Sequence, residues 1–335
     1  MDTIATILRC PRCLSPLERL SAGLAAEFIC SDSGCLYGSC DAAFPAVDGQ
    51  PVLIDFEQSL FDRVAFAEAR PPAPPGGATL GSAIGQRLRR IKNRLLRGTN
   101  SAASAMADRF LKETKTVAGN AGRPPRILVI GGGTAGSGSE ALYADPEVEV
   151  VGTDVYASSL TVLVSDGHRL PFADASFDGV WIQAVLEHVL EPSVVVAQIH
   201  RVLRSDGVVF ADTPFMQQVH MGAFDFTRFT PSGHRWLFRR FEQIEAGISG
   251  GAGVATIWSI RYLARALGVG SSLAGAIAAP LFWLRLLDRF TRSRAGADAA
   301  CGVFFLGRRS MTALHPKDMP HYYESYFGEA GAGHG

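Results

Sequence analysis

The chain has 335 residues, of which 32 are basic and 32 acidic, so its formal net charge is zero. This length can bury a large core and favours one main domain with additions, while the neutral balance argues against a nucleic-acid partner. The hydrophobic content of 47% is high for a soluble protein. The first residues nevertheless lack the basic segment and long apolar core of a secretory signal. We therefore expect a cytoplasmic protein, in which cysteines bind metals more often than they form disulfides.

Residues 1–56 form a cysteine-bearing module. Its five cysteines are Cys10, Cys13, Cys30, Cys35 and Cys40. Two cysteine pairs about 17–20 residues apart fit a tetrahedral thiolate zinc site, which takes four ligands. The first four cysteines are favoured, with Cys40 as the alternative ligand. Four thiolates would leave no position open for water, so such a zinc ion would be structural.

The sequences CPRC, FIC and FPAVDGQPVLI in this module resemble the short zinc-ribbon proteins that partner tRNA and protein methyltransferases. The resemblance spans the module and implies a small N-terminal zinc ribbon. The spacing of Cys30 and Cys35 departs from the usual second pair.

Residues 57–123 are predicted to be a linker with one basic amphipathic helix. The stretch RPPAPPGG at 70–77 cannot sustain a helix or a sheet ladder. The segment 84–97 carries an apolar stripe at helical spacing, surrounded by six basic residues. Such a helix can attract anionic lipid, or it can pack one face on the core and leave the other in solvent.

Between residues 124 and 246, short apolar runs alternate with helical segments, a pattern that predicts a parallel sheet. Helices are expected near 138–144 and 192–203. So few residues separate Asp154 from Thr161 that the crossover between these strands should be a turn or loop rather than a helix. The predicted strands cover residues 126–131, 148–154, 161–166, 177–183, 207–213, 241–248 and 301–309.

The first of these strands runs into the glycine-rich sequence ILVIGGGTAGSG. Gly131, Gly133 and Gly136 match the spacing of a dinucleotide-binding loop, and the Gly-Lys-Ser/Thr ending of a phosphate-binding P-loop is missing. Asp154 ends the next strand, 21 residues after Gly133. A carboxylate there can accept both ribose hydroxyls, a device that NAD and S-adenosylmethionine (SAM) enzymes share.

Two further sequences narrow this choice: SDGHRLPFADASFDGV, which begins at Ser165, and RVLRSDG, which begins at Arg201. Together they resemble class I SAM-dependent methyltransferases of the type 11 kind, over roughly 124–246 and the strand near 301–309. The resemblance implies a Rossmann-like α/β fold with a seven-stranded, mostly parallel sheet whose last strand is antiparallel. The domain would cover 124–312 with an apolar helical insertion at 247–300, followed by a C-terminal tail over 313–335.

The resemblance also implies which residues bind SAM. The first two glycines of the loop would lie against its methionine part, Asp154 would bind the ribose diol, and Asp166 would accept the adenine amine. Val129 departs from the family, which usually has an acidic residue two places before the first glycine, and Ala135 replaces a usual glycine. The implied set is Gly131, Gly133, Asp154, Val155, Asp166, Gly167, His168 and Gln183.

Methyl transfer from a sulfonium needs alignment of the acceptor and exclusion of water, and a base only where the acceptor is protonated. His220 is the first candidate for that base and His188 the second, with Glu187 nearby in sequence. Asp225 and Arg228 are expected to pair with each other. The stretch DFTRFT resembles methyltransferases of cell-surface glycan pathways, which suggests a glycan or lipid-linked acceptor.

Two other functions compete with this prediction. One is a non-catalytic methyltransferase-like module that acts through its zinc ribbon, and the other is a nucleotide-sugar or NAD oxidoreductase. The LPFADASFD loop argues against the oxidoreductase.

The segment 266–284 is uncharged and flanked by arginines. Its length is marginal for a membrane span, and its glycines and proline weaken that interpretation. We expect peripheral contact with the inner face of a membrane through 84–97 and 261–289, or a hydrophobic lid. A helical hairpin packed on the core comes second and a true span last.

Overall fold

The computed structural model describes residues 2–20, 28–64, 100–119, 122–290 and 293–325. The proline-glycine stretch 70–77 and the basic helix expected at 84–97 lie outside these ranges, and both stay predictions.

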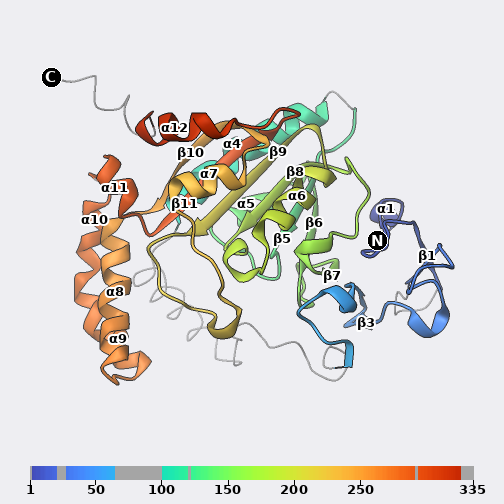
Figure 1. Ribbon diagram of the computed structural model, residues 1–335, viewed down its shortest axis with the longest axis horizontal. Helices are drawn as coiled ribbons and strands as arrows, with labels where there is room; N and C mark the ends of the chain where they lie inside the picture. The colour runs from blue at the N-terminus through green and yellow to red at the C-terminus, as the bar shows by residue number, and fades with distance from the viewer. Residues whose placement is uncertain (1, 21–27, 65–99, 120–121, 291–292, 326–335) are drawn as a thin grey trace.

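A nine-stranded sheet runs through the molecule in the order β10-β11-β9-β8-β5-β6-β7-β4-β3 (Figure 1). Neighbouring strands from β7 to β9 are parallel, whereas β11 is antiparallel to both β9 and β10. All seven predicted strands are present, and the Rossmann-like order with its antiparallel last strand is confirmed. These strands are β5 (Arg126–Ile130), β6 (Glu149–Asp154), β7 (Leu163–Ser165), β8 (Phe177–Gln183), β9 (Leu203–Pro214), β10 (Phe241–Gly250) and β11 (Gly302–Arg309).

The sheet has two strands more than the seven expected, because the N-terminal module joins it. Strand β4 (Gln50–Leu53) pairs in parallel with β7, with Val52 opposite Val164, and β3 (Ala46–Val47) pairs with β4 in antiparallel fashion. The apolar sequence PVLI explains this pairing, since Val52 and its two neighbours are buried against β7. Strand β7, which would otherwise be an edge strand of the seven predicted strands, is thereby covered by β4.

The rest of the N-terminal module packs beside this edge (Figure 1). Leu8 forms an isolated bridge with Phe172, and the amide of Arg9 donates to the carbonyl of Pro171 at 2.9 Å. The buried rings of Tyr37 and Phe44 stack with their centroids 4.3 Å apart. The elements of the module are α1 (Asp2–Ala5), β1 (Leu17–Arg19), β2 (Phe28–Cys30), η1 (Cys40–Ala42) and, after β4, η2 (Phe56–Gln58).

The two faces of the sheet are covered by different helices. Val129, Trp181 and Phe210 point to one face, which is covered by α4 (Ser101–Gly119) and α5 (Ser139–Ala144). Side chains that alternate with them along the strands point to the other face, covered by α6 (Pro192–Val202) and α7 (Pro231–Leu237). As predicted, no helix connects β6 to β7; residues 155–162 form turns and irregular chain.

Helix α4 is an element that the sequence analysis missed, since it lies in the stretch assigned as a linker. Its apolar residues recur at helical spacing and form the stripe that packs on the sheet. The buried positions are Ala103, Met106, Ala107, Phe110, Leu111, Thr114, Val117 and Ala118.

A helical region projects from the end of the sheet opposite the N-terminal module (Figure 1). The segment 266–284 is divided among several short helices, and among the described residues no helix is long and apolar enough to cross a membrane. The region comprises α8 (Ala252–Ala266), α9 (Ser271–Ala278), η6 (Ala279–Trp283), α10 (Leu284–Leu287) and α11 (Arg294–Asp298); after β11 follow η7 (Pro316–Asp318) and α12 (Met319–Ser325).

Candidate cofactor and acceptor site

The predicted glycine loop begins directly after β5. Gly131 has φ +74°, a conformation that favours glycine, and a Cβ there would lie 2.2 Å from Cγ2 of Val185. A Cβ on Gly133 would lie 2.4 Å from the ring of Tyr156. The local packing therefore requires both glycines. The side chains of Val185 and Tyr156 fill the space beside these two α-carbons.

Asp154 ends β6 beside this loop. Its Oδ2 accepts a hydrogen bond from the amide of Gly133 at 2.8 Å, and its Oδ1 accepts one from the amide of Val155 at 2.7 Å. Burial raises the pKa of Asp154, although these two hydrogen bonds lower it. A carboxylate offers about four lone-pair sites, so Asp154 keeps the capacity to accept two more hydrogen bonds, as a ribose diol would require.

Asp166 follows the neighbouring strand, β7, and caps the short helix η3 (Gly167–Arg169). Its Oδ1 accepts a hydrogen bond from the amide of His168 at 2.9 Å and lies 2.6 Å from Nδ1 of the same residue. Burial opposes ionisation of Asp166, but the hydrogen bonds from His168 hold its pKa below the ordinary value. The same contact raises the pKa of His168. Asp166 is thus an ionised, oriented acceptor.

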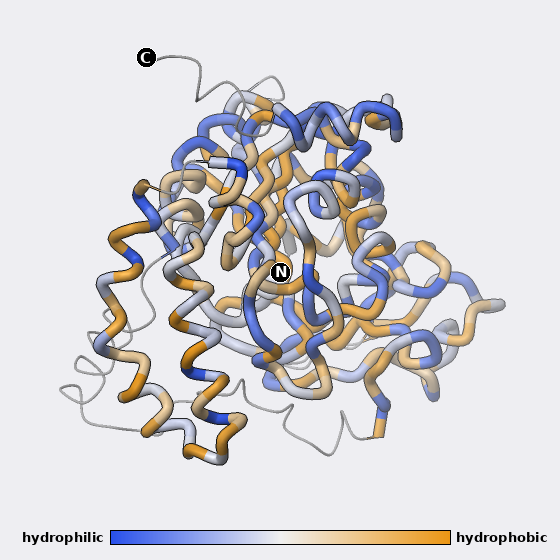
Figure 2. The backbone as a smooth tube through the Cα atoms, turned by 60° about the vertical axis from the view of Figure 1, so that its left-hand side comes forward, coloured by the Kyte–Doolittle hydropathy of each residue, from blue (hydrophilic) through white to orange (hydrophobic). Residues whose placement is uncertain are grey.

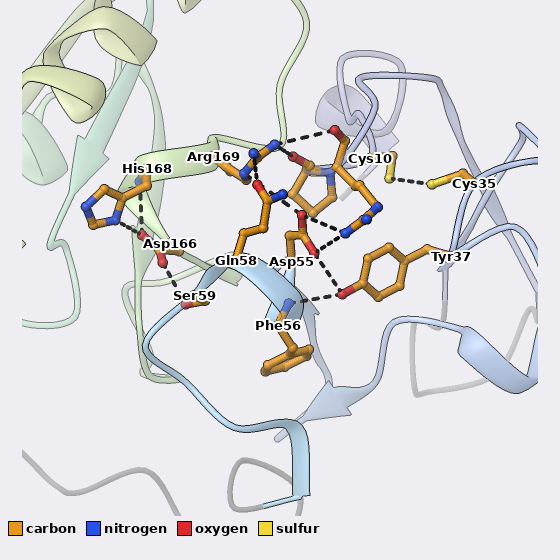
Figure 3. A network of polar contacts seen from close by, with 12 residues as sticks. Cys10, Cys35, Tyr37, Asp55, Phe56, Gln58, Ser59, Asp166, His168 and Arg169 are labelled. Carbon is orange, nitrogen blue, oxygen red and sulfur yellow. Dashed lines mark hydrogen bonds and ion pairs between the residues drawn. The ribbon is translucent and has the colours of Figure 1, made fainter. Parts of the chain in front are cut away.

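The second oxygen of Asp166 accepts a hydrogen bond from a residue that lies far earlier in the sequence, just after η2 (Figure 3). The hydroxyl of Ser59 donates to Oδ2 of Asp166 at 2.7 Å. Sequence reasoning missed Ser59, because a serine in a predicted linker carries no signal of a distant partner.

Asp55 lies at the centre of the same network (Figure 3). Its buried carboxylate pairs with Arg12 at 3.2 Å, lies 3.9 Å from Arg169 and accepts a hydrogen bond from the hydroxyl of Tyr37 at 3.3 Å. Arg169, which immediately follows His168, also bonds to Gln58. These contacts connect the cysteine-bearing module with the segment that carries Asp166.

Val129 does not face the candidate site. Its side chain is buried in the core beneath α4, where an acidic residue would lack water.

A different carboxylate, Asp212 near the end of β9, lies among the residues that line the adjoining cavity. The amide of Asn100 donates a hydrogen bond to it, and Gln183 stands opposite it in register on β8. Burial raises the pKa of Asp212 to about 6, although hydrogen bonds from neighbours that include Asn100 lower it. Its position at a strand end was the only sequence signal.

A cavity of about 1060 Å³ opens beside the glycine loop. Its lining includes Ser137 of the glycine loop, Gln183 at the end of β8, Glu187 and His220. Helix α8 contributes Trp258. The cavity is large enough for a small-molecule ligand, since such sites commonly measure about 300–1,000 Å³.

The two predicted histidines lie side by side, and His220 lines this cavity. His188 ends η4 (Leu186–His188), and the centroid of its ring is 5.0 Å from that of His220. The Nε2 atoms of His188 and His220 lie 3.6 Å and 4.0 Å from Oε1 of Glu187. Burial lowers the pKa of both histidines and raises that of Glu187 to about 8. Sequence reasoning named these residues but did not place them against one another.

Asp225 and Arg228 form the expected ion pair, with Nη2 of Arg228 2.9 Å from Oδ2 of Asp225. Burial opposes ionisation of Asp225, but the hydrogen bonds from Arg228 lower its pKa to about 2. The same carboxylate accepts a hydrogen bond from the amide of His220 at 2.8 Å. The pair therefore fixes the loop that carries His220.

A second cluster lies in the N-terminal module, where four thiols converge. The sulfurs of Cys10 and Cys35 are 3.8 Å apart, and those of Cys13 and Cys30 are 3.4 Å apart. Four thiolates bound at about 2.3 Å around a tetrahedral ion would lie about 3.8 Å from one another, so the geometry fits zinc. Cys40 is exposed at the start of η1 and is not in this cluster.

The sequence of the central strands matches a known family. Residues 128–211, which run from β5 into β9, match the family model described as a methyltransferase domain. A malonyl-[acyl-carrier protein] O-methyltransferase from Laribacter hongkongensis is 32% identical over 112 residues, covering 27% of this chain and 37% of the relative. A demethylmenaquinone methyltransferase from Mycolicibacterium vanbaalenii is 31% identical over 116 residues, covering 32% of this chain and 50% of the relative.

Among solved structures, a SAM-dependent methyltransferase from Archaeoglobus fulgidus aligns with a TM-score of 0.41 and 12% identity, covering 66% of this chain and 99% of the other. The present chain spans half or less of the length of the two curated relatives. The family match itself covers the glycine loop, Asp154, Asp166 and Gln183. The segment from β5 into β9 is therefore similar to a methyltransferase domain.

Proposed function

We propose that this protein is a SAM-dependent methyltransferase that acts on a small-molecule acceptor. The observation that carries the proposal is the position of Asp154 and Asp166. Asp154 ends β6 and Asp166 follows the adjacent parallel strand β7, and the amide of Gly133 in the glycine loop donates to Asp154. Open α/β sheets bind their ligands at this edge.

The residues present fit the parts of SAM. Asp154 would accept the ribose hydroxyls and Asp166 the exocyclic amine of adenine, with Val155, Gly167 and His168 beside them. Gln183 would line the methionine end. Asp212 would supply there the negative charge that Val129 does not, and its partner would be the ammonium group of the methionine part.

SAM supplies an electrophilic methyl group on a sulfonium. The contribution of the chain would be to hold the acceptor in line with that methyl group and to exclude water. The cavity between the strand ends and α8 supports the holding of an acceptor, because Trp258 and residues 250–251 line it beside Gln183. The proton of a protonated acceptor would leave on the side of Glu187, His188 and His220, where the two predicted base candidates lie.

The names of the two curated relatives favour an acyl-carrier-linked acid or a quinone over the glycan suggested by DFTRFT. We therefore propose a small, partly apolar acceptor, with a lipid-linked compound as one form of it. The apolar residues exposed along α8 to α10 support contact with a membrane surface, and we propose such contact for 261–289.

We also propose that Cys10, Cys13, Cys30 and Cys35 bind one structural zinc ion. The convergence of their four sulfurs supports this assignment over one that includes Cys40.

Calorimetric titration of purified protein with SAM tests the proposed function. The expected result is saturable binding, and absence of binding would contradict it. Incubation with methyl-labelled SAM and cell fractions then identifies the class of acceptor, by showing whether label enters lipid, small molecules, glycan, protein or RNA. Binding of SAM without transfer to any fraction would favour the non-catalytic module.

A further inference from the structure

Glu187 is a buried carboxylate without a hydrogen-bond partner among the described residues. Glu187 is only 1% exposed to solvent. Neither oxygen of its side chain makes a hydrogen bond to another residue in the described part of the chain. A buried carboxylate normally has a positively charged or hydrogen-bonding neighbour, because burial without one is costly. Glu187 nevertheless lines the acceptor cavity, beside the predicted cofactor loop. Its position therefore indicates a ligand that the side chains around it do not supply.

Two histidines, His188 and His220, each direct their Nε2 atom toward Oε1 of Glu187. Nδ1 of His188 lies 2.7 Å from the carbonyl oxygen of Phe224, and a carbonyl can only accept, so Nδ1 carries the proton. The Nε2 of His188 then presents a lone pair to Oε1 of Glu187, 3.6 Å away.

His220 repeats this arrangement. Its Nδ1 lies 3.4 Å from the carbonyl oxygen of Gln218 and 3.4 Å from Oδ2 of Asp225, and both neighbours are acceptors. Its Nε2 also faces Oε1 of Glu187, at 4.0 Å. Three acceptor groups thus face one another across a small space.

A metal ion fits this space better than a shared proton does. The two N···O separations exceed the length of a hydrogen bond. Ligands bound at about 2.0–2.2 Å around one ion lie about 3.0–3.6 Å apart, so small side-chain movements would complete the coordination. One ligand atom from each of the three residues already lies within 4.8 Å of the other two.

The surroundings also resemble those of known metal sites. A metal-binding histidine usually donates its other N–H to a carboxylate or a carbonyl, which fixes its tautomer. Phe224 supplies such a carbonyl to His188, and Asp225 supplies such a carboxylate to His220. Arg228 holds that carboxylate in place.

We propose that Glu187, His188 and His220 bind a divalent transition-metal ion at the acceptor end of the cavity. Two imidazoles and one carboxylate leave coordination positions open. An oxygen of the acceptor would take one of these positions. The role assigned to the ion rests on the proposed methyltransferase function, whereas the binding of the ion does not.

In that role the ion would lower the pKa of an acceptor hydroxyl, whose proton would pass to solvent. The oxygen would then form a bond to the methyl carbon while the bond from that carbon to sulfur breaks. The electron pair would stay on sulfur, and a neutral thioether would leave. The acceptor class is accordingly an oxygen nucleophile able to bind a metal.

Manganese is a suitable probe, since it favours oxygen ligands such as carboxylates over thiolates. Protein loaded with one equivalent of zinc, to fill the cysteine cluster, is titrated with Mn²⁺, and free Mn²⁺ is followed by electron paramagnetic resonance. The wild type should bind one Mn²⁺. Loss of an outer partner of a metal site typically costs about 10–100-fold in affinity, so Glu187→Gln and His220→Ala should each lose at least that much.

His321→Ala is the matched control, because His321 is exposed in α12, away from the cavity. It should bind Mn²⁺ as the wild type does. Calorimetry with SAM on the same variants shows that the fold persists. Absence of Mn²⁺ binding in the wild type, or unchanged binding in Glu187→Gln, would overturn the proposal even where SAM binds normally. Normal Mn²⁺ binding without SAM binding would instead contradict the proposed function.

Discussion

The hydroxyl of Ser59 donates a hydrogen bond to Oδ2 of Asp166, 2.7 Å away. This contact joins the segment that follows the cysteine-bearing module to the carboxylate assigned to adenine. Because the other oxygen of Asp166 is bonded to His168, the serine completes the orientation of this side chain. The N-terminal module and the segment that follows it therefore contact the proposed cofactor site through this hydrogen bond as well as through the shared sheet.

Replacing Ser59 with alanine should weaken SAM binding without unfolding the protein. The lost hydrogen bond to a charged group is worth about 1.5–3 kcal/mol when fully effective, and Asp166 keeps its bonds to His168, so we expect a loss of about tenfold in affinity. Calorimetry with SAM measures the change. Ser272→Ala, at an exposed position of α9, serves as the control and should bind SAM normally. Equal affinities in the two variants would show that Ser59 has no such role.

The four-cysteine assignment predicts a difference between two otherwise similar substitutions. Cys13→Ser should abolish stoichiometric zinc and lower the melting temperature, because a structural zinc site contributes directly to folding. Cys40→Ser should leave both unchanged, since Cys40 lies outside the cluster. Elemental analysis and thermal unfolding provide the measurements. Zinc lost with Cys40 and kept with Cys13 would reverse the assignment.

Asp154→Asn should strongly impair SAM binding. The amide can no longer accept hydrogen bonds through both side-chain atoms, so it loses the bond to the Gly133 or the Val155 amide and part of its capacity for the ribose diol. Bonds to a charged acceptor are worth about 1.5–3 kcal/mol each, and affinity should fall at least tenfold. Asp108→Asn, an exposed position on α4, is the control. Wild-type affinity in Asp154→Asn would remove this residue from the site.

The projecting helices carry many hydrophobic residues (Figure 2). Several of these side chains are exposed. Leu267 and Phe282 are 76% and 59% exposed, and arginines flank the region. The wild type should sediment with anionic phosphatidylglycerol vesicles, and the double variant with Leu267→Ser and Phe282→Ser should do so less, because it buries less apolar area in the interface. Met311→Ser, equally exposed but outside these helices, should sediment as the wild type does. Equal sedimentation of all three proteins would exclude this surface.

The sequence made the strands and their ends predictable, because apolar runs followed by Asp154 and Asp166 occur at typical positions of the fold. Helix α4 was also readable in principle, since Phe110 and its neighbours recur at helical spacing. The contact of Ser59 was not, because it depends on how the N-terminal module meets β7. The approach of His220 to Glu187 was equally hidden, since a long irregular loop brings it there.

The last prediction concerns pH and Asp212. Burial is the main cause that raises the pKa of this carboxyl to about 6 in the folded protein. The pKa of an aspartate in an unfolded chain is about 3.9. Protonation is thus favoured by folding, so the contribution of Asp212 to stability is present at low pH and is lost as pH rises from about 4 through 6.

Binding of SAM should show the opposite dependence, because its ammonium group would favour the ionised form. Only about a tenth of the carboxyl is ionised one unit below its pKa, so affinity should rise about tenfold between pH 5 and pH 7. Calorimetry across this range tests the slope, and Asp212→Asn should flatten it. A slope that persists in that variant would assign the titration to another group, whereas a flat wild-type profile would mean that Asp212 does not meet the cofactor's charge.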